Sequence, residues 1–342
     1  MTPGGQLMGR QSVHLAFVGS GNWARKYHFP TLAYLTQRSV TQDLGVDLYL
    51  RGIYSLDSEI AAGVATETGF EHVYPSLDAL LDDEAVDAIA VAVTPSALAS
   101  VLKRVIAKGV PIFSEKPPGV TTQEAKGLSD LITVPNVLAF NRRFIPLNNT
   151  FKSLVENLAD IYYVEGAFYR HQRTDETFMI GTGIHWINFM EYLFGEIQDV
   201  NVARFPNPSN NTVNRIAQLT FPNKLRAQLK VFQCAGAQVE RIEVHSASRS
   251  LTLYGPLWEQ PGRIIIHEGA QETIIDPEAT NPLPEIIRLG IVGEYVEFLT
   301  KACAGLPTRS NFQNAVNSMR VAEAMEVIAA GRESEQEVSS KQ

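Results

Sequence analysis

The chain has 342 residues, of which 45% are hydrophobic and 19% are charged, and its formal net charge at pH 7 is −8. This length exceeds one ordinary hydrophobic core and predicts two domains, while the composition is that of a globular protein. The acidic balance, without a basic block, argues against nucleic acid or an anionic membrane as a partner, and no apolar stretch approaches the roughly 20 residues of a spanning helix.

Short β-branched runs alternate with helical patterns over the first 140 residues. Strands that are apolar on both faces and separated by helices indicate a parallel sheet covered on both sides. The predicted strands are residues 13–18, 46–54, 72–74, 88–93, 110–113 and 136–139. The predicted helices are residues 23–35, with a break near Pro30, and residues 58–68, 77–81, 97–108 and 122–132.

From about residue 160 the pattern changes to consecutive strands separated by turn residues. In runs such as RAQLKVFQ, polar and apolar residues alternate, which is typical of a strand with one face exposed to solvent. Several such strands in succession predict a large antiparallel sheet. These strands are expected at residues 161–170, 215–221, 226–233, 241–247, 250–255 and 263–269. Two helices are expected to end the chain, at 285–303 and 312–330, the second N-capped by Ser310 or Asn311.

The run AFVGSGNWA places a Gly19-x-Gly21-x-x-Ala24 pattern directly after the first strand and at the start of a helix. Gly19 permits a tight turn, Gly21 lets the backbone approach a pyrophosphate, and Ala24 permits close packing of helix on strand. The pattern alone is weak evidence. Its place on the first strand of a βαβ series favours dinucleotide binding over a plain glycine turn.

The end of the second strand, in the run GIYSLDSE, bears on the choice between NAD and NADP. An acidic residue is expected there to bind the ribose diol, and this chain has Ser55 instead. Arg25 and Lys26 could supply charge to a 2′-phosphate, whereas Asp57 could be a helix N-cap or a substitute ribose ligand. The expected cofactor is therefore NAD or NADP, with the balance slightly toward NADP.

The run FSEKPPGVT completes a series of motifs that resembles the Gfo/Idh/MocA family of nicotinamide-dependent oxidoreductases, which act mostly on sugars, cyclitols and related polyols. The likeness covers nearly the whole chain in order. The likeness rests on these segments: the glycine loop, AVTPSALA, Glu115-Lys116-Pro117, AFNRRFIP, Gly183-x-His185, YLFGEI and NSMRVAEAMEVIAAG.

The resemblance implies an α/β Rossmann domain at residues 1–140, then an α+β domain at 141–342 built on a large open, predominantly antiparallel sheet. That sheet would be the interface of a homodimer or homotetramer, and the last helix could pack back on the Rossmann domain. The implied partner is a small sugar-like substrate.

Lys116 matches the family's lysine beside the nicotinamide and the reacting carbinol. A lysine partly buried at the carboxyl end of a parallel strand has a lowered pKa and can exchange a proton, whereas the alternative is a solvated loop lysine. Pro117 resembles the proline of a sharp, sometimes cis, turn, and Glu115 is expected to fix this loop and touch the cofactor. The expected cofactor-binding residues are Gly19, Ser20, Gly21, Asn22, Trp23, Tyr54, Ser55, Thr94, Pro95, Ser96, Glu115, Lys116, Asn141 and Arg143.

Asn141 and Arg143 match an N-x-R-F segment at the domain junction, where polar groups reach cofactor and substrate. Arg143 is expected to face the cleft and Arg142 to be structural, although the two could also form a solvated basic pair. The family often has a histidine at the position of Ala99, and this chain does not.

His185 matches the histidine of the family pattern Asp-x-Gly-x-His-x-x-Asp, which stands with the first aspartate beside the substrate hydroxyl. Here Gly181 replaces the first aspartate and Asn188 the last, so the usual proton relay lacks its carboxylate. His185 alone could take the proton because its ordinary pKa is near neutral, whereas the alternative is a packed core histidine. Lys116 and His185 are the expected catalytic residues.

The run FYRHQRTDETFM, just before this helix, is unusually polar. Asp175 or Glu176 could supply the missing carboxylate, and Arg170, His171 and Arg173 could hold a charged substrate, but an exposed loop of mixed charge fits equally well. The histidines show no metal-ligand spacing, so no metal is expected. The expected substrate-binding residues are Arg143, Arg170, Asp175, Thr182 and His185.

Together these residues predict an NAD(P)-dependent dehydrogenase or reductase that moves hydride between the nicotinamide and a carbinol or carbonyl carbon of a sugar, cyclitol or related polyol. One alternative is a non-catalytic dinucleotide-binding sensor, which Gly181 would suit, and another is an NAD-dependent glycosidase. The expected location is the cytoplasm, because the first residues lack a signal-peptide pattern and the only cysteines, Cys234 and Cys303, lie far apart.

Overall fold

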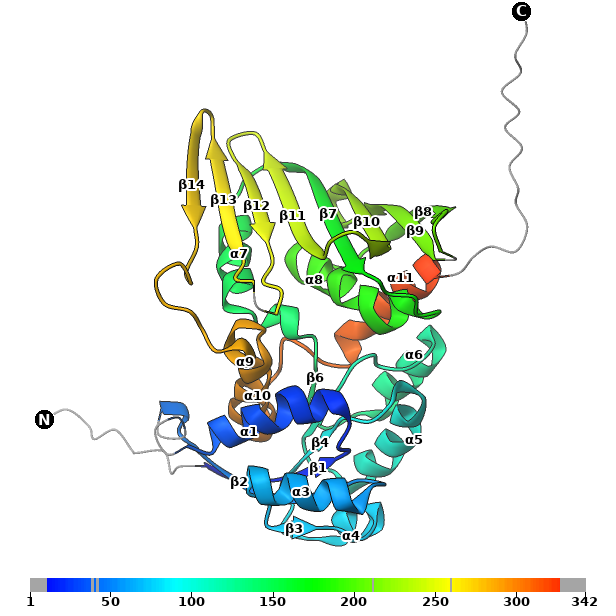
Figure 1. The fold of residues 1–342 in the computed structure, drawn as a ribbon, viewed down its shortest axis with the longest axis vertical. Helices are drawn as coiled ribbons and strands as arrows, with labels where there is room; N and C mark the ends of the chain where they lie inside the picture. The colour runs from blue at the N-terminus through cyan, green and yellow to red at the C-terminus, as the bar shows by residue number, and fades with distance from the viewer. Residues whose placement is uncertain (1–10, 38–39, 41–42, 211, 259, 327–342) are drawn as a thin grey trace, which may run out of the picture.

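The computed structural model describes residues 11–37, 40, 43–210, 212–258 and 260–326, which form two sheets with helices around and between them (Figure 1). The first sheet has six parallel strands in the order β3-β2-β1-β4-β5-β6. Its strands are β1 (Gln11–Val18), β2 (Val46–Tyr54), β3 (His72–Val73), β4 (Ala88–Val91), β5 (Ile112–Ser114) and β6 (Asn136–Leu138).

Every strand and helix predicted before residue 140 is present in this part of the structure. The helices are a π turn η1 (Ala24–His28) that continues as α1 (Phe29–Leu35), then α3 (Ser58–Thr68), α4 (Leu77–Asp82), α5 (Pro95–Val105) and α6 (Thr122–Leu131). Strand order reverses between β1 and β4, so the loops that follow these two strands meet at the carboxyl edge of the sheet. In doubly wound sheets that edge is the place where ligands bind.

The second sheet has eight strands in the order β14-β13-β12-β11-β7-β10-β9-β8. Neighbouring strands are antiparallel except β7 and β10, which are parallel. Its strands are β7 (Ile161–His171), β8 (Asp199–Pro206), β9 (Val213–Thr220), β10 (Arg226–Ala235), β11 (Val239–Ser246), β12 (Ser250–Tyr254), β13 (Arg263–Glu268) and β14 (Gln271–Ile275). The predicted α/β and predominantly antiparallel α+β parts are therefore confirmed.

The two strands that the sequence pattern did not predict, β8 and β14, are the edges of this sheet. In β14 the side chains are exposed or only partly buried, and in β8 none is fully buried. Such strands need no alternation of apolar and polar residues, because neither face is covered by the core.

Helices α7 (Pro146–Glu156) and α8 (Ile184–Phe194) lie on the same face of the eight-stranded sheet (Figure 1). Along β10 every second residue from Ala227 to Gln233 is buried, as its alternation predicted. A Cβ added to Gly166 of β7 would lie 3.1 Å from the sulfur of Met190, so the absence of a side chain lets α8 pack directly on the strand.

The expected helix at residues 285–303 is instead two helices, α9 (Glu285–Arg288) and α10 (Ile291–Thr300), separated by Gly290. Gly290 has φ +80°, and a Cβ there would lie 2.5 Å from the carbonyl oxygen of Asn141. The single helix predicted from the apolar pattern is wrong at this point because the chain turns sharply where two backbones meet.

The last third of the chain returns to the first sheet. The ring of Tyr295, on α10, stacks on Phe113 of β5 with centroids 4.3 Å apart. Beyond α10, the segment at residues 308–312 runs beside β6, where Leu138 N donates to Ser310 O at 3.1 Å. The final described helix, α11 (Val316–Glu326), packs against α6 and α8, so the last helix does contact the Rossmann part.

The N-cap predicted for the last helix is present one turn earlier, where Asn311 Oδ1 accepts from Asn314 N at 2.9 Å. Residues 327–330 of that predicted helix lie outside the described residues. Where one domain ends and the next begins, near residue 140, stays a prediction. None of the described helices is both long enough and apolar enough to cross a membrane.

Candidate active site

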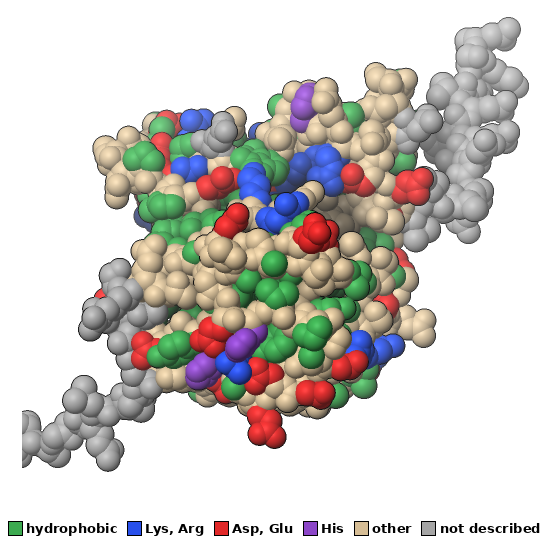
Figure 2. Space-filling model, turned by 60° about the horizontal axis from the view of Figure 1, so that its bottom comes forward, with side chains coloured by type: hydrophobic (Ala, Val, Ile, Leu, Met, Phe, Trp, Pro, Cys, Tyr) green, Lys and Arg blue, Asp and Glu red, His purple; other side chains and the backbone are tan. Residues whose placement is uncertain are grey.

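A cleft of about 730 Å³ lies between the carboxyl edge of the six-stranded sheet and the face of the eight-stranded sheet that carries α8. Loops after β1, β2, β4 and β5 line one side of it, and α8, β7 and β11 contribute to the other. Figure 2 shows Lys and Arg side chains gathered in the hollow between the two halves of the molecule.

The glycine loop forms one end of this cleft. Gly19 has φ +107°, and a Cβ there would lie 2.2 Å from the carbonyl oxygen of Ala92, so only glycine lets the ends of β1 and β4 come this close. A Cβ on Gly21 would meet no atom within 4 Å, which leaves its backbone open to a ligand. The pyrophosphate of NAD(P) therefore fits this loop, at the N-terminus of the following helix.

The end of β2 is joined to the same loop by a hydrogen bond of 2.6 Å between the hydroxyl oxygens of Ser20 and Ser55. Gly19 N also donates to Tyr54 O at 2.8 Å. Asp57 does not line the cleft; its side chain accepts from Ile60 N at 3.0 Å and caps α3. The structure thus resolves the alternative for Asp57 in favour of the helix cap.

Glu115 holds three parts of the cleft wall together. Its Oε1 accepts from Trp23 Nε1 and lies 3.0 Å from His28 Nε2, while its Oε2 accepts from the main-chain N–H of Lys116 at 3.1 Å. Burial alone would raise the pKa of Glu115, but the hydrogen bond and charge of His28 outweigh it, and the pKa is lowered. An ionised Glu115 fixes the loop, as the sequence predicted.

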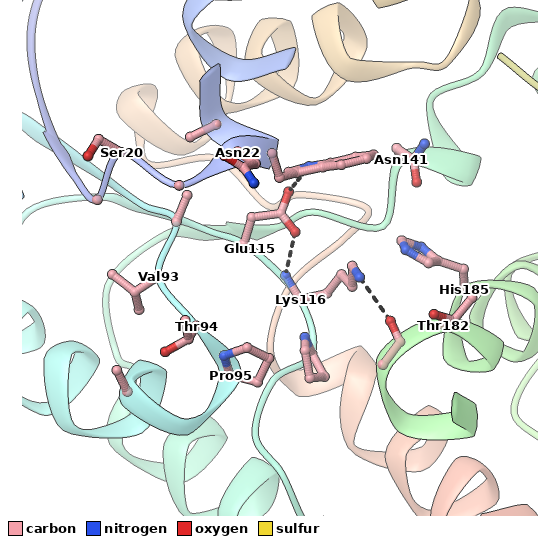
Figure 3. Close-up of a pocket in the computed structure, with 18 of the residues that line it drawn as sticks. Ser20, Asn22, Val93, Thr94, Pro95, Glu115, Lys116, Asn141, Thr182 and His185 are labelled. Carbon is pink, nitrogen blue, oxygen red and sulfur yellow. Dashed lines mark hydrogen bonds between the residues drawn. The ribbon is translucent and has the colours of Figure 1, made fainter. Parts of the chain in front are cut away.

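The peptide bond between Lys116 and Pro117 is cis. The side chain of Lys116 crosses the cleft toward α8 (Figure 3). Its Nζ donates to the carbonyl oxygen of Gly181 at 2.9 Å. Gly181 belongs to a π turn, η4 (Met179–Gly183), that leads into α8. Burial lowers the pKa of Lys116 against the opposing negative charge of Glu115, and the positive charges of Arg142 and Arg173 lower it further. The amine therefore loses its proton more readily than a solvated lysine does.

His185 lies in the first turn of α8 and lines the same cleft, facing the Lys116 side chain (Figure 3). Its ring meets that of Phe140 edge-on, with centroids 6.0 Å apart, and its Nδ1 has no hydrogen-bond partner among the described residues. Burial places the pKa of His185 well below the ordinary value, and the charges of Arg142 and Lys116 reinforce this. The imidazole is therefore neutral at physiological pH.

Two arginines and one glutamate form a buried cluster at the far end of the cleft. Arg142 donates to both carboxylate oxygens of Glu240, from Nε at 3.1 Å and from Nη2 at 2.5 Å. Arg170, on β7, donates to the same Oε1, so one carboxylate serves two guanidinium groups. We refer to Arg142, Arg170 and Glu240 as the arginine cluster.

Two family models match the chain. Residues 13–141 match the Gfo/Idh/MocA oxidoreductase family with its NAD-binding Rossmann fold, and residues 155–252 match the C-terminal domain of the same family. The chain belongs to the Gfo/Idh/MocA family. Membership confirms the predicted resemblance and, at the level of the family, the expected NAD(P)-dependent dehydrogenase.

Solved structures with the same fold are dehydrogenases of low sequence identity. A levoglucosan dehydrogenase in complex with NADH and levoglucosan is 16% identical, with a TM-score of 0.79 over 92% of this chain and 96% of that one. A dehydrogenase (MviM) from Clostridium difficile is 16% identical, with a TM-score of 0.77 over 91% and 98%. UDP-N-acetylglucosamine 3-dehydrogenase GnnA from Acidithiobacillus ferrooxidans is 19% identical, with a TM-score of 0.74 over 92% and 96%. No curated protein matches the chain.

Most residues expected to bind the cofactor in this Gfo/Idh/MocA protein line the cleft. They are Gly19, Ser20, Gly21, Asn22, Trp23, Tyr54, Ser55, Thr94, Pro95, Glu115, Lys116 and Asn141. Ser96 does not line it; it is exposed in the first turn of α5, 3.3 Å from the hydroxyl of Thr94. Arg25 and Lys26 are likewise outside the lining, and Arg104 of α5 is a cation within it.

The expectation that Arg143 faces the cleft and binds cofactor and substrate is wrong. Arg143 is buried, and it donates from Nε to Asn188 Oδ1 at 2.7 Å and from Nη1 to Arg309 O at 2.5 Å. Its neighbour Arg142 lines the cleft instead. The two side chains diverge because residues 141–143 form a 3₁₀ turn, in which successive side chains point about 120° apart.

Of the expected substrate-binding residues, Arg170, Thr182 and His185 line the cleft. Asp175 does not; it pairs with Arg173, and both side chains are exposed at the surface. Glu240 also lines the cleft, and sequence reasoning missed it together with Arg142. A signal for Glu240 existed, since it is a charged residue in phase with the buried Ile242 and Val244 of β11.

Proposed function

We propose that this protein oxidises a carbinol of a sugar-like polyol, or reduces the corresponding carbonyl, with NAD(P) as the hydride carrier. The observation that supports this most is that Lys116 and His185 lie in the same cleft. Both line the cleft that the glycine loop opens into, and burial lowers the pKa of both. A buried amine with a lowered pKa and a neutral imidazole at a nicotinamide site suit the removal of a proton from a hydroxyl group.

The residues of the chain divide the work of this reaction. When bound, the nicotinamide supplies the hydride acceptor at its C4 atom. As the carbinol C–H bond yields its hydride, Lys116 in its unprotonated form accepts the hydroxyl proton at Nζ, and the C–O single bond becomes a carbonyl. The carbonyl of Gly181 orients Nζ, and the neutral imidazole of His185 offers a second group to hold the hydroxyl.

Lys116→Ala tests the proposal. We expect kcat to fall by roughly 10²- to 10⁴-fold, since general base catalysis contributes about that much, while the affinity for NADH, followed by fluorescence titration, changes little. Lys126→Ala, at an exposed lysine that pairs with Asp130, is the matched control. Cofactor binding without turnover on any sugar or polyol would instead support the sensor, and release of free sugar from an aryl glycoside would support the glycosidase.

The choice of NADP over NAD is part of the proposal. Ser55 carries no charge to repel a 2′-phosphate, and its hydroxyl is joined to Ser20 of the glycine loop. A cation, Arg104, also lines the cleft. We expect NADPH to bind more tightly than NADH, and Ser55→Asp to weaken NADPH binding by at least about tenfold while affecting NADH less. Tighter binding of NADH by the unaltered protein would contradict this choice.

We further propose that the eight-stranded sheet is the interface of a homodimer or homotetramer. Its face opposite α8 carries aromatic side chains, including Tyr169 and Phe232, whose rings stack with centroids 4.6 Å apart, and Tyr162 is 64% exposed. Light scattering coupled to size exclusion would measure the assembly, and a monomer at micromolar concentration would contradict it.

A further inference from the structure

The arginine cluster places an excess of positive charge at the substrate end of the cleft. Arg142 and Arg170 share one carboxylate, that of Glu240, so the three side chains together carry one net positive charge. Their side chains are 14%, 4% and 1% exposed, in the order Arg142, Arg170 and Glu240. Charge this far from water is poorly compensated by solvent, and it is stabilised when an anion comes into contact with it.

The acidic side chains that line the cleft do not provide this anion. Among the described residues they are Glu115 and Glu240, and Glu115 is already bonded to Trp23 and His28 on the cofactor side. The other lining residues of basic type are Arg104, Lys116 and Arg173. Arg104 pairs with Asp78 and Arg173 with Asp175, so the excess charge is that of the cluster itself. The hollow with its Lys and Arg side chains is visible in Figure 2.

The neighbouring groups respond to this positive field. Burial lowers the pKa of Arg170 to about 10, against the opposing charge of Glu240 and with the charge of Arg142 adding to the effect. After burial, Arg142 and Arg170 are among the charges that lower the pKa of His185. The cluster, Lys116 and His185 line one cleft and interact electrostatically, so a single small molecule could contact the cluster with an anionic group and the proposed catalytic residues with a carbinol.

We propose that the substrate is a sugar acid, a polyhydroxylated carboxylate whose anionic group binds Arg142 and Arg170. This inference rests on the proposed dehydrogenase function and adds the chemical class of the substrate. Arg142 already donates from Nε and Nη2 to Glu240 and from Nη1 to Asn141 Oδ1, so the substrate carboxylate would share the two arginines with Glu240 through their remaining N–H groups. The carbinol of the acid is oxidised to a carbonyl, NAD(P)⁺ is reduced, and the carboxylate is unchanged, so the product is an oxo acid.

The positive charge of the arginine cluster makes the substrate end of the cleft complementary to an anionic sugar and not to the neutral sugar of the same configuration.

Binding to the protein–NADPH complex, measured by calorimetry, tests this inference apart from turnover. The probes are neutral hexoses, the matching aldonates and uronates, and the matching hexose 6-phosphates. We expect at least one acid to bind about 10- to 100-fold more tightly than its neutral counterpart, the range of one charge-assisted interaction. Equal affinities, no binding by any acid, or tighter binding by the phosphates would each overturn the proposal.

Two variants, one that removes a positive charge from the cluster and one that removes its negative charge, distinguish recognition of the substrate's charge from a structural role of the cluster. Arg142→Gln neutralises one guanidinium, and we expect it to remove most of the preference for the acid. Glu240→Gln leaves both arginines and removes their shared anion, so acid affinity is expected to rise, whereas a purely structural Glu240 predicts a loss. Arg241→Gln is the control, because Arg241 pairs with Glu165 and Glu243 on the other face of β11.

The outcomes also distinguish this inference from the proposed function. Preferential binding of an acid without hydride transfer would leave the acid site standing and remove the dehydrogenase. Turnover of neutral sugars without any preference for acids would support the dehydrogenase and remove the acid site. Retention of NADPH binding and an unchanged circular dichroism spectrum show that each variant is folded.

Discussion

Lys116 Nζ donates a hydrogen bond of 2.9 Å to the main-chain carbonyl of Gly181, so a backbone oxygen orients the amine at the position where the family pattern has an aspartate. A carbonyl accepts the hydrogen bond without carrying a full negative charge. This hydrogen bond therefore does not offset the lowering of the Lys116 pKa by burial. A carboxylate at this position would hold the lysine in its charged form.

Gly181→Asp is expected to fold, because a Cβ on Gly181 meets no atom within 4 Å and its φ is not in the left-handed region. The new carboxylate favours the charged forms of Lys116 and His185 and raises the pKa of both. The acid side of the profile of kcat/KM against pH should therefore move to higher pH, by about one unit. Gly181→Asn, equal in size and uncharged, is the control, and identical profiles for the two variants would contradict the expectation.

Gly19 and Gly21 are expected to respond differently to alanine. Gly19→Ala imposes φ +107° on a residue with a Cβ and drives that atom to 2.2 Å from Ala92 O, which should cost about 1–3 kcal/mol of the free energy of unfolding. Gly21→Ala meets no atom of the protein. It should leave thermal stability nearly unchanged and weaken NADPH binding by about tenfold or more. Thermal denaturation and fluorescence titration of both variants give the comparison, and a similar loss of stability in both would refute it.

Glu294, on α10, should make stability depend on pH. It is fully buried, and neither carboxyl oxygen has a hydrogen-bond partner among the described residues. Burial raises the pKa of Glu294 well above 4.5, and the charge of Glu115 adds to the effect. Because the folded-state pKa is raised, this contribution to stability is fully present below about pH 4.5 and is lost as pH rises through the folded-state pKa.

Glu294→Gln removes this titration, so the variant should gain stability relative to the unaltered protein as pH rises from about 5 to 8. Urea denaturation at several pH values measures the difference, with Glu67→Gln, an exposed residue of α3, as the control. A constant difference across this pH range would show that Glu294 does not carry a raised pKa.

The sequence predicts the first sheet closely because its central strands are apolar throughout, as in β4, where all four residues are buried. The glycine loop is predicted by its place after the first strand, whereas Lys116 and His185 are predicted from the resemblance to the family, and the structure places all three in one cleft. The break between α9 and α10 is not predicted, because the apolar pattern continues across Gly290. Glycine is required there by the close approach of the Asn141 backbone, which is far away in sequence.

The residues that the sequence could not place depend on rotation within a turn or on contacts between distant strands. Arg142 and Arg143 are adjacent and chemically identical, and only the 3₁₀ turn and the position of Asn188 decide which one reaches the cleft. Glu240 becomes part of the site because β11 pairs with β7, which carries Arg170. Such pairings are set by the whole sheet and leave no local pattern.

The return of the chain to β5 and β6 has a consequence for its synthesis. The ring that stacks on Phe113 belongs to Tyr295, and the segment that bonds along β6 begins at residue 308. The first sheet is therefore completed only after residues 295–312 have been synthesised. Until then Phe113 and the edge of β6 lack their native cover, which leaves an apolar surface and an open strand edge of the kind that favours association between chains.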